Sequence, residues 1–218
     1  AFEGCIKRRI GYADPERARD VKRVVMSYLP GESRIIGIEI DDRDPCMARG
    51  LEGQGDRSRS FCSDRLGVGG AGPQLVVIPA GGRVDKFAIS KTEVKVADYN
   101  QFCEKTGCQT LAGSRSIPAT NLSVTQATAY MTWLSQQSGK TYRLPTVDEW
   151  ELAARGEGEP LDDNINCTVD SRGVRLGEKL LSTLSGKPNG YGLFNHVGNA
   201  REWAVQADGS LVALGGAH

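Results

Sequence analysis

The stretch of sequence that decides the fold reads Pro188-Asn-Gly-Tyr-Gly-Leu-Phe-Asn-His-Val-Gly-Asn-Ala-Arg-Glu-Trp203. It follows neither the period of an amphipathic helix nor the strict alternation of a half-buried strand. Glycine, asparagine and aspartate are frequent in the whole chain beyond Gly156, where few periodic stretches occur. Something other than regular hydrogen-bond ladders must therefore fix the backbone of this region.

Two helix-start signals precede this stretch. Ser123-Val-Thr-Gln126 and Thr146-Val-Asp-Glu149 both have the capping-box pattern. In that pattern a hydroxyl oxygen accepts a hydrogen bond from the N–H three residues on, and a Gln or Glu side chain accepts from the N–H of the first residue. They predict helices over residues 124–138 and 147–155, and a glycine directly after each range ends the helix.

Shorter elements are predicted toward the N-terminus. Residues 96–103 predict a short helix, and residues 74–78 form a β-rich run. Residues 86–90 alternate like a half-buried strand. Residues 15–29 carry apolar side chains at helical spacing, and the isoleucine-rich residues 34–40 predict a strand.

The composition changes within the first third of the chain. Residues 41–73 are rich in Asp, Arg, Gly and Ser, which is typical of a loop or linker. A boundary near Gly72-Pro73 is therefore predicted. It would separate an N-terminal extension, residues 1–73, from a domain over residues 74–218.

Composition and charge exclude several classes of function. The chain has 27 Lys+Arg against 27 Asp+Glu, so it lacks the basic excess that non-specific nucleic-acid or anionic-membrane binding needs. The two histidines, His196 and His218, cannot form a three-histidine zinc centre. No apolar run is longer than that of Leu75–Ile78, which is far shorter than the ~20 residues of a membrane-spanning helix.

The chain contains six cysteines, an even and high number that favours an oxidising compartment. We therefore expect a periplasmic or otherwise extracytoplasmic location. Cys103 and Cys108 are closest in sequence, and Gly107 between them is a helix-stop signal, so they are the first predicted disulfide. The other four cysteines are Cys46 and Cys62, predicted as a second disulfide, and Cys5 and Cys167, either paired or free.

Three segments, in this order, resemble the sulfatase-modifying-factor or formylglycine-generating-enzyme family. They are Phe87–Tyr99, Asn121–Gly156 and Pro188–Trp203, and the resemblance covers residues 74–218. It implies a C-type-lectin-like α+β fold with few short helices, small sheets and much irregular backbone. Residues 1–73 lie outside the resemblance.

The resemblance also implies a calcium site in the third segment. The positions that match the family's ligands are the Asn195 side chain, the backbone carbonyls of Gly198 and Ala200, and the Glu202 carboxylate. Calcium takes about 6–8 oxygen ligands of these kinds. Glu202 alone in this set carries a negative charge, so water or another carboxylate must complete the shell. The alternative is that Asn195 and Glu202 brace the loop through hydrogen bonds.

Catalysis in this family depends on a copper-binding cysteine pair that oxidises a substrate cysteine. The pair follows an Arg-Gly-Gly-Ser-Trp motif, which here reads Leu214-Gly-Gly-Ala-His218 at the end of the chain. We therefore expect the catalytic pair to be absent. Cys103 and Cys108 lie far upstream of that position and are interpreted as a structural disulfide.

The resemblance thus favours a non-catalytic binding or regulatory module. In style the sequence is similar to domains associated with bacterial Ser/Thr kinases, including the periplasmic regulator of the threonine-phosphorylation pathway of type VI secretion. Gly72–Pro79 and Gly186–Gly190 contribute to this similarity. The expected partner is the periplasmic part of such a kinase. The alternatives are a formylglycine-generating copper oxidase whose C-terminal part is not represented, and a lectin-like domain that binds carbohydrate or host protein.

Overall fold

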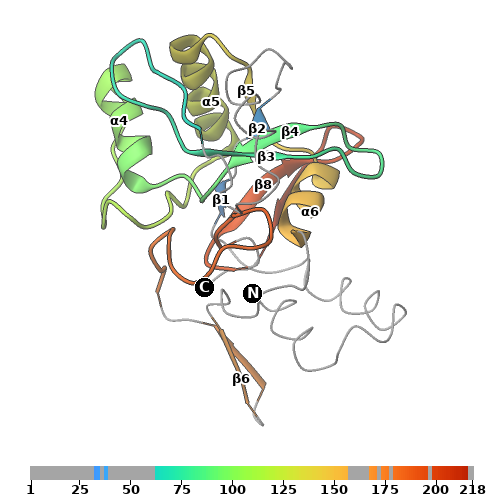
Figure 1. Ribbon diagram of the computed structural model, residues 1–218. Coiled ribbons are helices and arrows are strands. Elements are labelled where there is room, and N and C mark those ends of the chain that lie inside the picture. The colour runs from blue at the N-terminus through green and yellow to red at the C-terminus, as the bar shows by residue number, and fades with distance from the viewer. Residues whose placement is uncertain are drawn as a thin grey trace.

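The computed structural model describes residues 32–34, 37–38, 62–156, 167–170, 173–176, 179–195 and 198–215 (Figure 1). The helices described are α4 (Val96–Thr106), α5 (Val124–Ser138) and α6 (Val147–Arg155). The strands described are β1 (Glu32–Arg34), β2 (Gly37–Ile38), β3 (Leu75–Ile78), β4 (Phe87–Ser90), β5 (Tyr142–Arg143), β6 (Cys167–Asp170), β7 (Gly173–Leu176), β8 (Arg201–Val205) and β9 (Leu211–Leu214). Within these ranges, no helix has the length and apolar character to span a bilayer. The predicted helix over residues 15–29 lies outside them.

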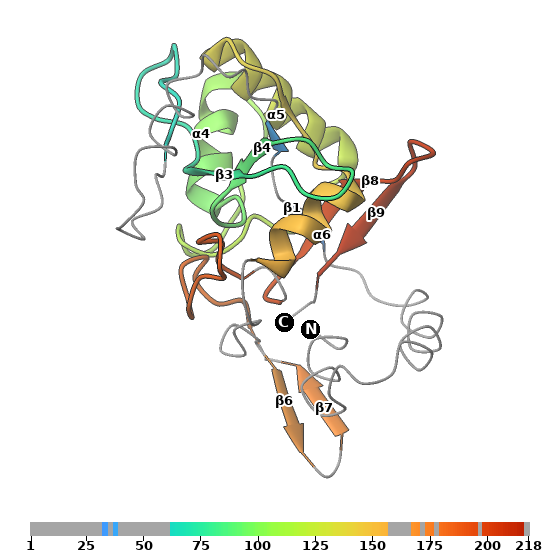
Figure 2. The same cartoon turned by 45° about the vertical axis from the view of Figure 1, so that its right-hand side comes forward.

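The described strands form small sheets. A four-stranded antiparallel sheet has the order β3-β4-β2-β5, and a three-stranded sheet has the order β1-β8-β9. In the latter, β1 runs parallel to β8 and β9 runs antiparallel to it. A separate hairpin of β6 and β7 projects from the rest (Figure 2). The predicted α+β class, with few short helices and small sheets, is confirmed.

Strands β3 and β4 of the four-stranded sheet are buried on both faces. Leu75 of β3 and Ala88 of β4 pack into the cluster that contains the buried faces of α4 and α5. The alternate residues of these two strands point to the other face of the sheet and form a second cluster. There Ile78 of β3 and Ile89 of β4 pack with Ala153 of α6. All four residues of β4 are buried. The prediction of a half-buried strand over residues 86–90 was therefore wrong, because helices cover both sides.

Aromatic rings fill the space between α4 and α5. Five ring pairs are in contact, with centroids 5.4–6.1 Å apart. They are formed by Tyr99 and Phe102 of α4 and by Tyr130 and Trp133 of α5. Edge-to-face and tilted packing of this kind stabilises beyond the area that it buries. The tryptophan of α5 therefore belongs to the core, where it holds the two helices together.

Both predicted capping boxes are present. At the start of α5, the Gln126 N–H donates to Ser123 Oγ at 3.3 Å and the Ser123 N–H donates to Gln126 Oε1 at 2.9 Å. At the start of α6, the Glu149 N–H donates to Thr146 Oγ1 and the Thr146 N–H donates to Glu149 Oε2. Local sequence thus fixes the beginnings of these two helices.

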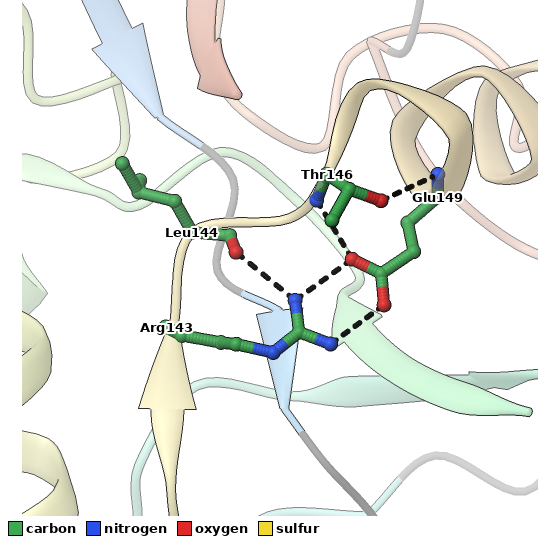
Figure 3. A network of polar contacts seen from close by, with 4 residues as sticks. All are labelled: Arg143, Leu144, Thr146 and Glu149. Carbon is green, nitrogen blue, oxygen red and sulfur yellow. Dashed lines mark hydrogen bonds and ion pairs between the residues drawn. The ribbon is translucent and has the colours of Figure 1, made fainter. Parts of the chain in front are cut away.

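A bidentate ion pair joins β5 to the start of α6 (Figure 3). Arg143 Nη1 donates to Glu149 Oε2 at 2.7 Å, and Arg143 Nη2 donates to Glu149 Oε1 at 2.6 Å. Burial alone would raise the pKa of Glu149, but the hydrogen bonds and charge of Arg143, with the bonds from Thr146, outweigh it and lower that pKa. The carboxylate is therefore held ionised as both a cap and an ion-pair partner.

Strands from the N-terminal side of residue 73 belong to both main sheets. β2 lies between β4 and β5, and β1 pairs with β8. The single strand predicted over residues 34–40 is replaced by these two short strands, because each pairs with a different sheet. Asp64 is also tied to the later chain through the Tyr142 hydroxyl and the Lys140 ammonium, both at 2.6 Å. Both main sheets therefore contain strands from before and after residue 73.

Candidate metal centre

Four polar side chains from distant parts of the chain meet in the interior. They are Glu93, Asn195, Asn199 and Glu202, each 2% exposed or less. Glu93 lies between β4 and α4, and Glu202 lies in β8. The two asparagines precede β8 with φ values of 52° and 68°. Asparagine adopts this left-handed conformation more readily than most residues, so the asparagine-rich sequence permits the bends that turn these amides inward.

Both asparagines donate to the carboxylate of Glu93. Asn195 Nδ2 lies 3.1 Å from Glu93 Oε2 and 3.3 Å from the Ser182 carbonyl oxygen. Asn199 Nδ2 lies 3.0 Å from Glu93 Oε1, and its Oδ1 accepts from the Leu181 N–H at 2.8 Å. Carboxylate and carbonyl oxygens only accept, so these contacts fix which way each amide points. Asn195 Oδ1 is left on the other side, where it accepts no hydrogen bond from the described residues.

The Glu202 carboxylate is incompletely satisfied. Its Oε2 accepts a hydrogen bond from the indole Nε1 of Trp150, which lies in α6. Its Oε1 is buried without a hydrogen-bond partner, and Thr183 Oγ1 is the other such side-chain atom among the described residues. Leaving a buried oxygen without a partner costs about 1–3 kcal/mol, and more when the group is charged. This arrangement is unfavourable unless another group meets Glu202 Oε1.

Glu93 and Glu202 act on each other electrostatically. Burial raises the pKa of Glu93 to about 8, although hydrogen bonds from Asn195, Asn199 and the Ala200 backbone oppose the increase. Burial and then the charge of Glu93 raise the pKa of Glu202 well above its usual value, against the hydrogen bond from Trp150. No cationic side chain of the described residues contributes to either pKa. Among the described residues, therefore, no cationic side chain balances these two buried carboxyl groups.

The predicted ligand residues lie around this cluster. Asn195 and Glu202 both belong to it, and Ala200 contacts Glu93 through its backbone N–H. The Ala200 N–H also donates to the Gly198 carbonyl at 2.9 Å, which closes a tight bend between the two predicted backbone ligands. The bracing role is present as well, because Asn195 and Glu202 each hold a neighbouring segment by a hydrogen bond.

The predicted ligands suit a hard cation. They are carboxylate, carboxamide and backbone carbonyl oxygens, which are the ligands that calcium prefers. Within the part of the chain that is described, no group of three or more His, Cys, Asp and Glu residues could hold a metal ion. A zinc-type centre of nitrogen and sulfur ligands is therefore not formed by those residues. The orphaned Oε1 of Glu202 is the atom that a cation would satisfy.

Glu93 was not among the predicted site residues. It is separated from Asn195 by 102 positions and from Asn199 by 106. The sequence offered one signal, the carboxylate of Glu93 in Lys91-Thr-Glu-Val94. It closely follows the apolar strand segment Phe87-Ala-Ile89. A charged residue in such a position is a reason to look for a buried partner.

The first predicted disulfide is confirmed. The Cys103 and Cys108 sulfurs are bonded, with their Cα atoms 4.4 Å apart. α4 continues to Thr106 before Gly107 ends it with a φ of 78°, so this turn brings Cys108 back to the last turn of the helix. Cys62 is disulfide-bonded too, while its predicted partner Cys46 lies outside the described residues.

Comparisons with known proteins identify related sequences. The profile of the sulfatase-modifying factor enzyme 1-like domain matches residues 79–213. Formylglycine-generating enzyme of Thermomonospora curvata is 33% identical over 105 residues, 40% of this chain and 33% of its own length. Formylglycine-generating enzyme of Streptomyces coelicolor is 33% identical over 118 residues, 43% of this chain and 33% of its own length. Each match thus covers about a third of the relative.

A solved structure was also found. The crystal structure of CarF aligns with a TM-score of 0.45 and 18% sequence identity, covering 80% of each chain. The family profile spans well over half of the sequence, from the residue after β3 into β9, and includes every residue of the buried polar cluster. The chain therefore belongs to the family of the sulfatase-modifying factor enzyme 1-like domain.

Proposed function

We propose that this chain is a calcium-structured, non-catalytic binding module that works outside the cytoplasm. The observation that carries the calcium part is the buried Glu202 carboxylate, whose Oε1 has no hydrogen-bond partner. A divalent cation would satisfy that oxygen and offset the repulsion between Glu202 and Glu93. Bound calcium would contribute charge neutralisation and a fixed loop geometry, and no redox chemistry.

The residues that would hold calcium come from one short segment. Glu202 would contribute its carboxylate, Asn195 its carboxamide oxygen, and Gly198 and Ala200 their backbone carbonyls. Asn195 Oδ1 is suited to this role because its amide nitrogen is already committed to other acceptors. Water would complete the shell, as is usual for calcium.

The cysteines support a structural role and an oxidising location. Three cysteines of the described residues are disulfide-bonded, namely Cys62, Cys103 and Cys108. Disulfides persist mainly in secreted and periplasmic proteins. In this proposal they stabilise the fold and leave substrate oxidation to other members of the family.

The proposed partner is the extracytoplasmic part of a membrane Ser/Thr kinase of the type that controls type VI secretion. The support is the similarity of Gly72–Pro79 and Gly186–Gly190 to kinase-associated members of the family. The test is binding of the full chain to that kinase segment, measured by calorimetry with calcium and with chelator. Calcium-dependent binding that Glu202→Ala abolishes is expected. Absence of binding under both conditions would overturn the partner assignment.

A second candidate is a formylglycine-generating oxidase. It is favoured by the two relatives of that name, which are 33% identical to this chain over 105 and 118 residues. Oxygen consumption on a cysteine-containing peptide with added copper separates the two functions. The binding-module proposal predicts no copper-dependent turnover by the full-length protein. Turnover that copper restores after chelation would establish the oxidase instead.

A further inference from the structure

We infer that Glu93 is the positioning residue of the proposed calcium site and supplies its second negative charge. The inference rests on the proposed function, because it assigns a role toward the same ion. It adds a residue from the β4–α4 connection to a site whose predicted ligands all lie between residues 195 and 202. Glu93 is 1% exposed, so its carboxylate contributes inside the protein and not at its surface.

The hydrogen bonds of Glu93 explain how it would orient a ligand. Its two carboxylate oxygens each accept from a different amide, Oε2 from Asn195 and Oε1 from Asn199. The second hydrogen of Asn195 Nδ2 goes to the Ser182 carbonyl. With both amide hydrogens committed, the carboxamide of Asn195 must present its oxygen in another direction. Glu93 therefore selects the amide orientation that makes Asn195 a ligand.

Charge balance gives the second part of the argument. The predicted ligand set contains one carboxylate, Glu202, against the two positive charges of calcium. Glu93 places a second carboxylate directly beside these ligands, because its Oε2 accepts from Asn195 Nδ2 at 3.1 Å. Two buried carboxylates around one divalent cation form a neutral unit. Two buried carboxylates without a cation are an uncompensated cost.

Asn199 has the complementary role of holding the network in place. Its amide nitrogen contacts Glu93 and the Leu181 carbonyl, and its Oδ1 accepts from the Leu181 N–H. All its polar atoms are thus used within the protein. Glu93 and Asn199 together fix the segment around residue 181 against the bend that precedes β8.

Calcium titration of Glu93→Gln by calorimetry tests this inference. Glutamine retains the shape but removes the charge, and its Nε2 would face one of the two amide nitrogens as a second donor. Because substitutions of orienting partners typically cost about 10- to 100-fold in metal affinity, we expect a weakening of that size. The matched control is Glu149→Gln, which changes another buried glutamate and breaks the Arg143 pair. It should lower the melting temperature and leave the calcium affinity unchanged.

Each outcome has a distinct meaning. Wild-type protein that binds no calcium overturns both this inference and the proposed function. Calcium binding by wild type that Glu93→Gln leaves unchanged overturns this inference alone. If Glu93→Gln does not fold, Glu93→Asp carries the test, because it keeps the charge but is too short to reach both amides. An intermediate loss of affinity supports the role of Glu93, and an unchanged affinity contradicts it.

Discussion

At the scale of single residues, Glu149 and Glu202 are both buried but differ in how their charge is met. The Glu149 carboxylate accepts hydrogen bonds from the Arg143 guanidinium and from the Thr146 N–H at the start of α6, so its pKa is lowered. Glu202 has one indole N–H and a neighbouring carboxyl group, so its pKa is raised. The contrast indicates that Glu149 stabilises the fold by itself, whereas Glu202 needs a further partner.

Glu149→Gln should destabilise the protein by about 1.5–3 kcal/mol at neutral pH, since it removes hydrogen bonds between charged groups. The folded-state pKa of Glu149 is depressed, so its contribution is complete above the unfolded value of about 4.3. The contribution is then lost as the pH falls through the folded pKa. Urea unfolding of wild type and variant across this range should show their stabilities converging in acid. A difference that stays constant down to the lowest pH would contradict this account.

At the scale of elements, α5 and α6 begin at the residues that the local capping signals predict. Ser123 and Thr146 each form both halves of a capping box, and no distant residue is needed for these contacts. The helix α4 differs, because Lys95 at its start makes no side-chain cap. Its end is instead fixed by Gly107 and the disulfide between Cys103 and Cys108.

Ser123→Ala should cost about 1 kcal/mol, because the Gln126 N–H loses its acceptor. Ser123→Gly is the matched variant and should cost only a few tenths of a kcal/mol. Both values come from chemical denaturation monitored by circular dichroism. Equal losses for alanine and glycine would show that the capping hydroxyl does not determine the stability of α5.

The contrast between these elements explains what could be predicted from the sequence. Both capped helices and the Cys103–Cys108 bond depend on residues a few positions apart, so they were predictable. The two- and three-residue strands β2 and β1 exist through pairing with distant strands, and their sequence carries too little signal. For the same reason Glu202 was assigned to a loop, although it lies in β8 between β1 and β9.

At the scale of the whole molecule, the buried polar cluster joins parts of the chain that are far apart. Glu93 lies just after β4 of the four-stranded sheet, and Glu202 lies in β8 of the three-stranded sheet. Trp150 connects α6 to the cluster through its hydrogen bond to Glu202, and α6 lies beside β8 (Figure 1). The family resemblance located Asn195 and Glu202, whereas Glu93 and Asn199 became visible only when the fold brought them together. An ion in this cluster would stabilise the contact between the two sheets.

Calcium should therefore slow amide hydrogen exchange in particular segments. Protection should increase around Leu181, whose N–H is bound by Asn199, and in β8, which carries Glu202. At exchange times too short for global unfolding, the interior of α5 should not respond, because its contacts are with the aromatic cluster and the capping box. The measurement is exchange detected by mass spectrometry with calcium and with chelator. A uniform response along the chain at these short exchange times would contradict a localised site.

The most direct test of the central claim is the melting temperature of wild type and Glu202→Ala, each measured with calcium and with chelator. A ligand that binds the folded state at about 100 times its dissociation constant stabilises it by about 2.7 kcal/mol. We therefore predict that calcium raises the melting temperature of wild type by several degrees and does not change that of Glu202→Ala. An unchanged melting temperature of wild type after chelation would contradict the claim that calcium structures this protein.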